Sequence, residues 1–237
     1  MKTIALVGAG EFTDAMNETD LYLYHQIKKL PAVVGIIATA SGQETAFDGW
    51  LDRGIEHFKK LSIKAIPIRV RNKEDAMNED YTKLVKQCGW IYFSGGDPSY
   101  LLSSIKNTLL WHTILSEYKH GCIISGASAG AMILGNLLLL NPMAAMRQLP
   151  AEFEPAFHLV DYMIIPHYDK IGDKFILLQE EIQRSLPLKE SEKFLGIDED
   201  TALIIQNTNG KAFGKGKCRI FIEGKKIVLQ NGEMSKI

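Results

Sequence analysis

The chain has few cysteines: Cys88, Cys122 and Cys218 are the only three in 237 residues. An odd number of widely separated cysteines gives no disulfide framework, and no Cys-x-x-Cys or Cys/His cluster indicates a bound metal. We therefore expect reduced core cysteines and neither a metal nor another cofactor. The cytoplasm is the expected compartment, since Met1-Lys2 leads straight into a strand pattern without the features of a signal peptide.

An excess of one charge and long hydrophobic runs are also missing. Lys and Arg number 27 against 28 Asp and Glu, so the formal net charge is −1. This balance predicts neither a nucleic acid partner nor an anionic membrane surface. The longest apolar stretch, Ala131 to Leu140, is interrupted by Gly135 and Asn136 and falls short of the roughly 20 residues that cross a bilayer. The expected partner is a small peptide substrate, and a homodimer is left open.

The remaining composition, 46% hydrophobic and 23% charged, fits one α/β domain over residues 1–237. Apolar runs of strand length alternate with segments of helical period. The expected strands are Ile4 to Val7, Val33 to Ala38, Ile63 to Val70, Trp90 to Phe93 and a run ending near Ile124. The expected helices are Asp20 to Lys29, Ala46 to Leu61, Glu74 to Cys88 and Ser99 to Tyr118. This order predicts a three-layer, doubly wound, mostly parallel sheet of flavodoxin-like type, with helices on both faces.

The pattern changes after Leu140. The segment from Asn141 to Phe157 contains three prolines and little periodicity, which predicts a loop or short helix near the site. A strand and a helix are expected next, at Tyr162 to Ile165 and about Asp173 to Ser185. Short strands at Thr201 to Gln206, Lys217 to Ile222 and Lys226 to Leu229, separated by turns such as Asn209-Gly210, then predict a C-terminal antiparallel extension.

One motif carries a chemical prediction. The strand-like run Cys122 to Ile124 leads into Gly126-Ala127-Ser128-Ala129-Gly130, and helical spacing follows. A serine between a strand and a helix in a Gly-x-Ser-x-Gly context is typical of a nucleophile elbow, which turns the hydroxyl outward. The alternative is a plain strand-to-helix turn that happens to contain a serine. Because the strand and the helix are both present, we favour Ser128 as a nucleophile.

A serine nucleophile needs a base and a group that orients the base. Of six histidines, His167 follows Pro166 at the end of the expected strand Tyr162 to Ile165, which puts it at the carboxyl edge of the sheet together with Ser128. The orienting acid is less determined. The turn after Gly196 contains Asp198 and Glu199, and Asp169 is a further candidate.

A second glycine turn follows the strand Trp90 to Phe93. Gly95, Gly96 and Asp97 lead there into a helix, so their amides face the same sheet edge. A glycine amide of this turn, paired with the amide of Ala129, would form an oxyanion hole; an ordinary Gly-Gly turn is the alternative. The segment Gly8-Ala9-Gly10 only weakly matches a dinucleotide-binding loop, because the third glycine is missing.

Taken in order, these motifs resemble the dipeptidase E and cyanophycinase family of serine peptidases, whose fold is related to class I glutamine amidotransferases. The resemblance rests on four segments: Gly95-Gly96-Asp97, Gly126 to Ala131, Pro166-His167 and Gly196 to Ala202. It implies Ser128 as nucleophile, His167 as base, Glu199 as orienting acid, and the Gly96 and Ala129 amides as oxyanion donors. The resemblance also implies Gly95, Asp97 and Lys170 as substrate-binding residues.

The chain also departs from that pattern. Pro98 stands where cyanophycinase-like sequences carry glutamine, and the stretch after His167 offers Lys170 and Lys174 in place of several arginines. A single lysine would bind an acidic substrate residue without the two-pronged geometry of arginine. The leading hypothesis is a serine hydrolase that cleaves an amide bond in a short peptide through an acyl-enzyme on Ser128; an acidic residue before the cleaved bond is left open. A catalytically silent module that binds a small metabolite or a partner, and an esterase or deacylase, are the alternatives.

Overall fold

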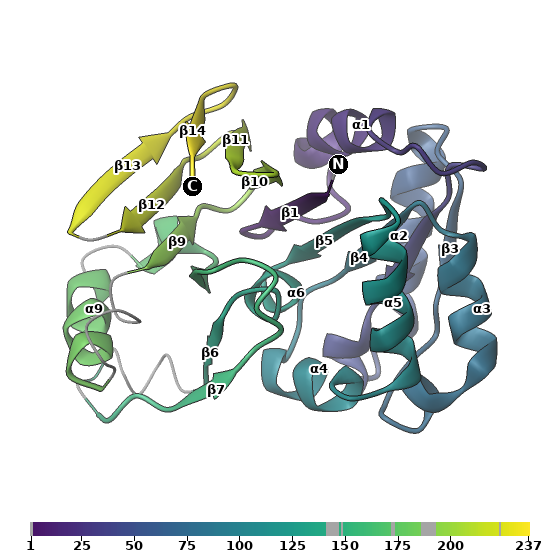
Figure 1. The fold of residues 1–237 in the computed structure, drawn as a ribbon, viewed down its shortest axis with the longest axis horizontal. Coiled ribbons are helices and arrows are strands. Elements are labelled where there is room, and N and C mark those ends of the chain that lie inside the picture. The colour runs from purple at the N-terminus through teal and green to yellow at the C-terminus, as the bar shows by residue number, and fades with distance from the viewer. Residues whose placement is uncertain (1, 141–146, 148, 172–173, 186–192, 223) are drawn as a thin grey trace.

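The computed structural model describes residues 2–140, 147, 149–171, 174–185, 193–222 and 224–237. These residues form a large, mostly parallel β-sheet flanked by helices, and a smaller sheet that contains C-terminal strands (Figure 1). The alternation of apolar runs and helical segments predicted this α/β fold, and the prediction is confirmed.

The described strands are β1 (Thr3–Val7), β2 (Val34–Ile37), β3 (Ala65–Pro67), β4 (Trp90–Phe93), β5 (Ile123–Ala127), β6 (Leu137–Leu139), β7 (Phe153–Pro155), β8 (Met163–Ile165), β9 (Phe194–Ile197), β10 (Thr201–Gln206), β11 (Asn209–Gly214), β12 (Cys218–Ile222), β13 (Lys225–Leu229) and β14 (Met234–Lys236). The described α-helices are α1 (Asn17–His25), α2 (Phe47–Lys60), α3 (Glu79–Gln87), α4 (Pro98–Ile105), α5 (Leu109–Lys119), α6 (Ala129–Met132), α8 (Tyr168–Ile171) and α9 (Lys174–Ser185).

The large sheet has the strand order β14-β11-β10-β1-β5-β4-β2-β3. The five strands from β1 to β3 in this order are parallel, whereas β10, β11 and β14 join antiparallel. Of the three strands expected in the antiparallel extension, only Thr201 to Gln206, which is β10, lies in this sheet; the other two are β12 and β13, which pair antiparallel with each other in a second sheet. The carboxyl ends of all five parallel strands lie at one edge of the sheet, where loops from different parts of the chain meet.

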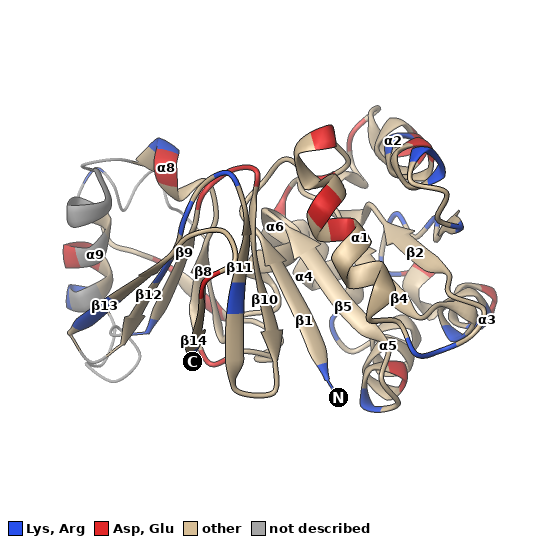
Figure 2. Ribbon diagram, turned by 90° about the horizontal axis from the view of Figure 1, so that it is seen from above, with Lys and Arg blue, Asp and Glu red and all other residues tan. Residues whose placement is uncertain are grey.

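Helices cover both faces of the large sheet (Figure 2). Alternate residues of a strand point to opposite faces, and β1 shows the division. Ala5 and Val7 pack into the cluster formed with α1 and α2, while Ile4 and Leu6 pack into the cluster formed with α3, α4 and α5. Because both faces of β1 are buried, its sequence is a continuous apolar run with no polar alternation.

The expected helix Ser99 to Tyr118 is two helices, α4 and α5. The chain turns between them at Asn107, whose φ is 59°. Thr108 then begins α5 as its N-cap, because its side-chain Oγ1 accepts a hydrogen bond from the Trp111 amide at 3.3 Å. An asparagine and a threonine in an otherwise helical pattern mark this break.

Other helix ends also differ from the prediction. The expected helix Glu74 to Cys88 begins later, at Glu79, because the side chain of Asn78 caps it by accepting from the Asp80 amide at 2.9 Å. The expected helix Asp20 to Lys29 is α1, which begins at Asn17 and ends at His25. After the serine, the helix is the single turn α6.

A second sheet, with the order β13-β12-β9-β8, corrects the predicted place of His167. The strand that precedes this histidine, β8, pairs in parallel with β9 and does not belong to the sheet that holds Ser128. Within the expected loop Asn141 to Phe157, β7 pairs antiparallel with β6; residues 141–146 and 148 lie outside the described residues. Asn209-Gly210, expected as a turn, begins β11.

The three cysteines are buried and free, as expected of reduced core residues. Burial raises the pKa of the Cys88 and Cys122 thiols to about 12, and it also raises the pKa of Cys218. These thiols stay protonated at neutral pH and are not nucleophiles. Among the described helices, none has the length and apolarity that a membrane crossing requires.

Candidate active site

Ser128 lies between β5 and α6 in a strained backbone conformation. Its φ is 48° and its ψ is −112°, a region that side-chain-bearing residues rarely occupy. Such strain persists only where the surrounding structure holds it, and it is typical of the serine in a nucleophile elbow. The elbow geometry that the motif predicts is therefore present.

The elbow depends on the absence of side chains at Gly126 and Gly130. A Cβ on Gly126 would lie 2.1 Å from the Gly130 carbonyl oxygen, and a Cβ on Gly130 would lie 2.4 Å from the Phe93 carbonyl oxygen. Both contacts are with backbone atoms, which cannot turn aside as a flexible side chain can. Glycine at 126 therefore lets β5 and α6 approach this closely, and glycine at 130 lets α6 approach the end of β4.

We expect Gly126→Ala to lower the free energy of unfolding by about 1–3 kcal/mol, because the new methyl group overpacks the elbow. Gly49→Ala is the matched control, since Gly49 lies on the exposed side of α2 and an added Cβ meets nothing within 4 Å. It should raise stability by about 0.5–1 kcal/mol, the helix preference of alanine over glycine. Urea denaturation measures both. Equal changes in the two variants would contradict the packing argument.

His167 contacts the serine although it comes from the second sheet. It follows β8, has a φ of 51°, and its Nε2 lies 2.9 Å from the Ser128 hydroxyl oxygen. The two elements meet because α6 packs against β8. The histidine side chain is 42% exposed, so water can reach the imidazole. The pair therefore has the distance that proton transfer from serine to a base requires.

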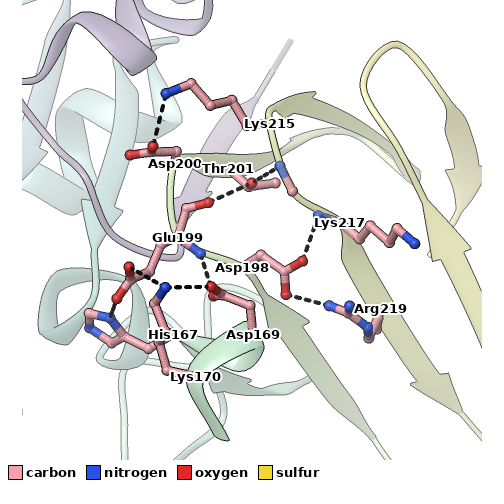
Figure 3. A network of polar contacts seen from close by, with 11 residues as sticks. His167, Asp169, Lys170, Asp198, Glu199, Asp200, Thr201, Lys215, Lys217 and Arg219 are labelled. Carbon is pink, nitrogen blue, oxygen red and sulfur yellow. Dashed lines mark hydrogen bonds and ion pairs between the residues drawn. The ribbon is translucent and has the colours of Figure 1, made fainter. Parts of the chain in front are cut away.

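Glu199 lies on the other side of the imidazole. Its Oε1 is 2.8 Å from His167 Nδ1 (Figure 3). A carboxylate can only accept, so Nδ1–H donates to Glu199, and Nε2 is left free to accept the proton of the Ser128 hydroxyl. Ser128, His167 and Glu199, which the family resemblance implies as a triad, are joined in this order by hydrogen bonds.

The two other candidate acids lie elsewhere in the same network (Figure 3). Asp198 turns away from His167: its Oδ2 accepts from the Lys217 amide at 2.8 Å, and its Oδ1 pairs with Arg219. Asp169 supports Glu199 instead of replacing it, because its Oδ1 accepts from the Glu199 amide at 2.9 Å. Of the three carboxylates, Glu199 alone makes a hydrogen bond to the histidine in the described part of the chain.

Lys170 lies among these carboxylates. Its ammonium is 3.2 Å from Asp169 and 3.4 Å from Glu199, and these neighbours raise its pKa. Partial burial alone would raise the pKa of Asp169. The hydrogen bond from the Glu199 amide and the charge of Lys170 have the larger combined effect, so the pKa of Asp169 is lowered. Lys170 lines neither of the cavities beside Ser128 described below, so the structure does not bring it to a substrate position. The side chain of Lys174 lies outside the described part of the chain.

Some backbone amides near Ser128 already donate hydrogen bonds within the protein, and others remain free to bind an oxyanion. The Gly95 amide donates to Glu11 Oε1 at 2.8 Å, and Asp97 caps α4 by accepting from the Ser99 and Tyr100 amides. Among the described residues, the Gly96 and Ala129 amides have no acceptor. Two free N–H groups beside a serine hydroxyl are what an oxyanion hole requires.

The Gly8-Ala9-Gly10 segment, which weakly matches a dinucleotide-binding loop, packs against another part of the protein. A Cβ on Gly8 would lie 2.1 Å from the Asp198 carbonyl oxygen, so this loop packs directly against the turn that bears Glu199. Two backbone hydrogen bonds fix the contact: the Gly8 amide donates to Thr201, and the Asp200 amide donates to Ala9. The end of β1 thus helps to hold the acidic turn in place.

Two cavities meet at Ser128 and His167. The first, of about 460 Å³, is lined mainly by apolar side chains, among them Met132, Leu139 and Met163, and we call it the apolar cavity. The second, of about 380 Å³, has Glu11, Trp50 and Arg53 in its wall, and we call it the polar cavity. A larger cavity of about 680 Å³ lies at the amino end of β1, beside Lys2, and contains none of the expected site residues.

Glu11, Trp50 and Arg53 are among the residues of the polar cavity that the sequence did not indicate. Glu11 follows the carboxyl end of β1, which is the same signal that identified Ser128 and the Gly95-Gly96 turn, so it could have been found. Trp50 and Arg53 lie within α2, and nothing in the local sequence distinguishes them from surface residues of that helix. The Arg53 guanidinium lies 4.9 Å from the centre of the Trp50 ring.

A strained serine at a strand-to-helix turn, hydrogen-bonded in series to a histidine and a carboxylate, is the arrangement of an α/β serine hydrolase. The model of peptidase family S51 matches residues 4–212. The chain therefore belongs to peptidase family S51 and is a serine-type peptidase, which confirms the family that its motifs resemble.

Individual relatives agree with this assignment. A cyanophycinase from Geminocystis herdmanii (strain PCC 6308) is 26% identical over 235 residues, which cover 97% of this chain and 83% of that protein. The uncharacterized peptidase Lin0382 from Listeria innocua is 27% identical over 186 residues, 75% of this chain and 86% of that protein. The crystal structure of a peptidase from an acI-B1 Actinobacterium superposes with a TM-score of 0.85 at 29% identity, covering 100% of this chain and 97% of that one.

Proposed function

We propose that the chain hydrolyses the peptide bond of short peptides through an acyl-enzyme on Ser128. The observation that carries the proposal is the hydrogen-bonded series from the Ser128 hydroxyl to His167 and on to Glu199, at 2.9 and 2.8 Å. His167 Nε2 takes the hydroxyl proton as the serine oxygen attacks the substrate carbonyl. The Gly96 and Ala129 amides donate to the oxyanion that forms.

The second half of the cycle uses the same groups. The protonated imidazole gives its proton to the leaving amine, so the peptide bond breaks and the acyl group stays on Ser128. Water then enters, His167 takes its proton, and the acid product leaves with the serine hydroxyl restored. Glu199 stays a carboxylate throughout and stabilises the imidazolium, while Lys170 and Asp169 hold it in position.

The lining of the two cavities favours a short substrate that has one charged residue and one apolar residue. Arg53 lines the polar cavity and, among the described residues, has no ion-pair partner, which makes it a better candidate than Lys170 for binding an acidic side chain. The apolar cavity suits an apolar leaving residue, because burying such a side chain contributes about 1.5–3 kcal/mol. We therefore propose a preference for an acidic residue before the cleaved bond and an apolar residue after it.

A panel of free dipeptides tests this proposal. Asp-Leu should be cleaved with a higher kcat/KM than Ala-Leu or Asp-Asp, and Arg53→Gln should lower the Asp-Leu value about tenfold while leaving Ala-Leu unchanged. The reason is the loss of one hydrogen bond to a charged group, which contributes about 1.5 kcal/mol. Lys59→Gln is the control, since Lys59 lies on the same helix with its side chain 77% exposed. The proposal fails if no dipeptide is cleaved.

We also propose the cytoplasm as the place of action. All three cysteines are free and buried. Unpaired cysteines in the core of a stable fold suit a reducing compartment.

A further inference from the structure

The cavity of about 680 Å³ beside Lys2 lies at the other end of the strands from the active site, and we call it the amino-end cavity. Its wall includes residues at the amino ends of three strands: Lys2 before β1, Tyr162 before β8 and Lys193 before β9. His167 follows the opposite end of β8. None of the residues that the structure describes lines both this cavity and either cavity at Ser128, so the amino-end cavity is separate from the catalytic centre.

Aliphatic side chains from both sheets line much of the amino-end cavity. Ile4 of β1 and Ile205 of β10 belong to the large sheet, Ile222 of β12 belongs to the second sheet, and Leu159 and Val160 come from the segment before β8. Sites for small organic molecules are typically cavities of roughly 300–1,000 Å³ with apolar walls and a few placed polar groups. The amino-end cavity has a volume in this range, and its apolar walls suit the apolar body of a small molecule.

Two tyrosines supply unused hydrogen-bond donors to the same cavity. Tyr118 and Tyr162 line it and are only 9% and 5% exposed, yet neither hydroxyl has a hydrogen-bond partner in the described part of the chain. A tyrosine hydroxyl that is withdrawn from bulk water usually has such a partner. Burial raises the pKa of Tyr118 to about 12 and also raises the pKa of Tyr162, so both hydroxyls keep their protons at neutral pH. Both can therefore donate to a ligand.

The unpaired charge in the wall is positive. The Lys2 ammonium lies 5.7 Å from the centre of the Tyr118 ring and forms no ion pair with the described carboxylates. Asp161 is also in the wall, but its charge is already compensated: Lys193 and His158 both pair with it, the latter at 3.1 Å, and together they lower its pKa. A free ammonium beside two hydroxyl donors favours an anion, and a carboxylate can accept from all three.

We propose that the amino-end cavity is a second binding site, which takes a small carboxylate with an apolar body such as an aromatic or branched aliphatic acid. The carboxylate accepts hydrogen bonds from the Lys2 ammonium and the Tyr118 and Tyr162 hydroxyls, and the apolar body packs between the two sheets. The site does not depend on the proposed peptidase reaction. Because β8 lies between Tyr162 and His167, a molecule bound there does not compete with a peptide substrate at Ser128.

Isothermal titration calorimetry with cinnamate and its neutral analogue cinnamamide tests the proposal. Wild-type protein should bind cinnamate at least about tenfold more tightly than cinnamamide, the effect of a hydrogen bond to a charged group. Lys2→Gln should weaken cinnamate binding about tenfold and leave cinnamamide binding unchanged, so that the preference is lost. Tyr118→Phe should weaken cinnamate binding by a similar factor without changing the melting temperature, because the hydroxyl that it removes has no partner within the protein.

Lys119→Gln is the matched control, since Lys119 is exposed next to Tyr118 but does not line the cavity. It should bind cinnamate as the wild type does. The inference is overturned if the wild type does not bind cinnamate, if it binds both compounds equally, or if the two cavity substitutions leave cinnamate binding unchanged. An equal loss in Lys119→Gln would also overturn it, because that result indicates a general effect of surface charge. If saturating cinnamate raises the KM for Asp-Leu competitively, it binds at Ser128 and the second site is wrong; failure to cleave any peptide would refute the proposed function alone.

Discussion

Ser128→Ala should lower kcat for Asp-Leu by about a millionfold, the loss expected when the nucleophile of a catalytic triad is removed. The Ser128 hydroxyl is the group within 2.9 Å of His167 Nε2, and alanine leaves the imidazole with no oxygen to deprotonate. The fold should be retained, because the methyl group of alanine occupies the same position as the Cβ of serine. Leucine release and thermal denaturation measure the two effects.

Ser103→Ala is the matched control for this variant. Ser103 is exposed on α4, and its hydroxyl donates to the Tyr100 carbonyl within the same helix. It should keep wild-type activity. Peptide hydrolysis that persists in purified Ser128→Ala would assign the reaction to another group.

Glu199→Gln should lower kcat by about ten-thousandfold while changing stability little. The amide can present an N–H to His167 Nδ1, which favours the tautomer with its proton on Nε2, and then Nε2 cannot accept the proton of Ser128. The variant also loses the negative charge that stabilises the imidazolium. Steady-state kinetics with Asp-Leu measure the loss.

Asp198→Asn is the matched control for Glu199→Gln, because it also replaces a carboxylate by an amide, at the neighbouring residue. Asp198 is buried and pairs with Arg219, so this variant should keep kcat but lose about 3 kcal/mol of stability, the cost of leaving one partner of a buried pair alone. The opposite pattern, with activity lost in Asp198→Asn and retained in Glu199→Gln, would show that the orienting acid is wrongly assigned.

The sequence predicted the bounds of two strands of the large sheet, one parallel and one antiparallel, for a physical reason. The strands β4 and β10 have the predicted bounds, because their runs of apolar residues have no helical period and are bounded by Gly or Asn. The break between α4 and α5 was missed, because it depends on one residue with positive φ and one cap. The second sheet was missed for another reason: β9 pairs with β8 and β12, and no local pattern specifies partners that distant in sequence.

The site was predictable where a residue follows a strand and unpredictable where tertiary packing selects it. Ser128 and His167 each follow a strand, so their positions could be predicted, even though the two strands belong to different sheets. Glu199 and Asp198 are adjacent, and the sequence cannot tell which of them faces the histidine; the position of Arg219 on β12 draws Asp198 away. Arg53 reaches the site only through the packing of α2.

The most direct measurement of the central claim is peptide mapping by mass spectrometry after inactivation with a fluorophosphonate. The account predicts one phosphonyl group per chain, carried by Ser128, with loss of Asp-Leu hydrolysis in proportion to labelling. Active enzyme that remains unmodified at Ser128, or inactivation that accompanies modification of another residue, would contradict it.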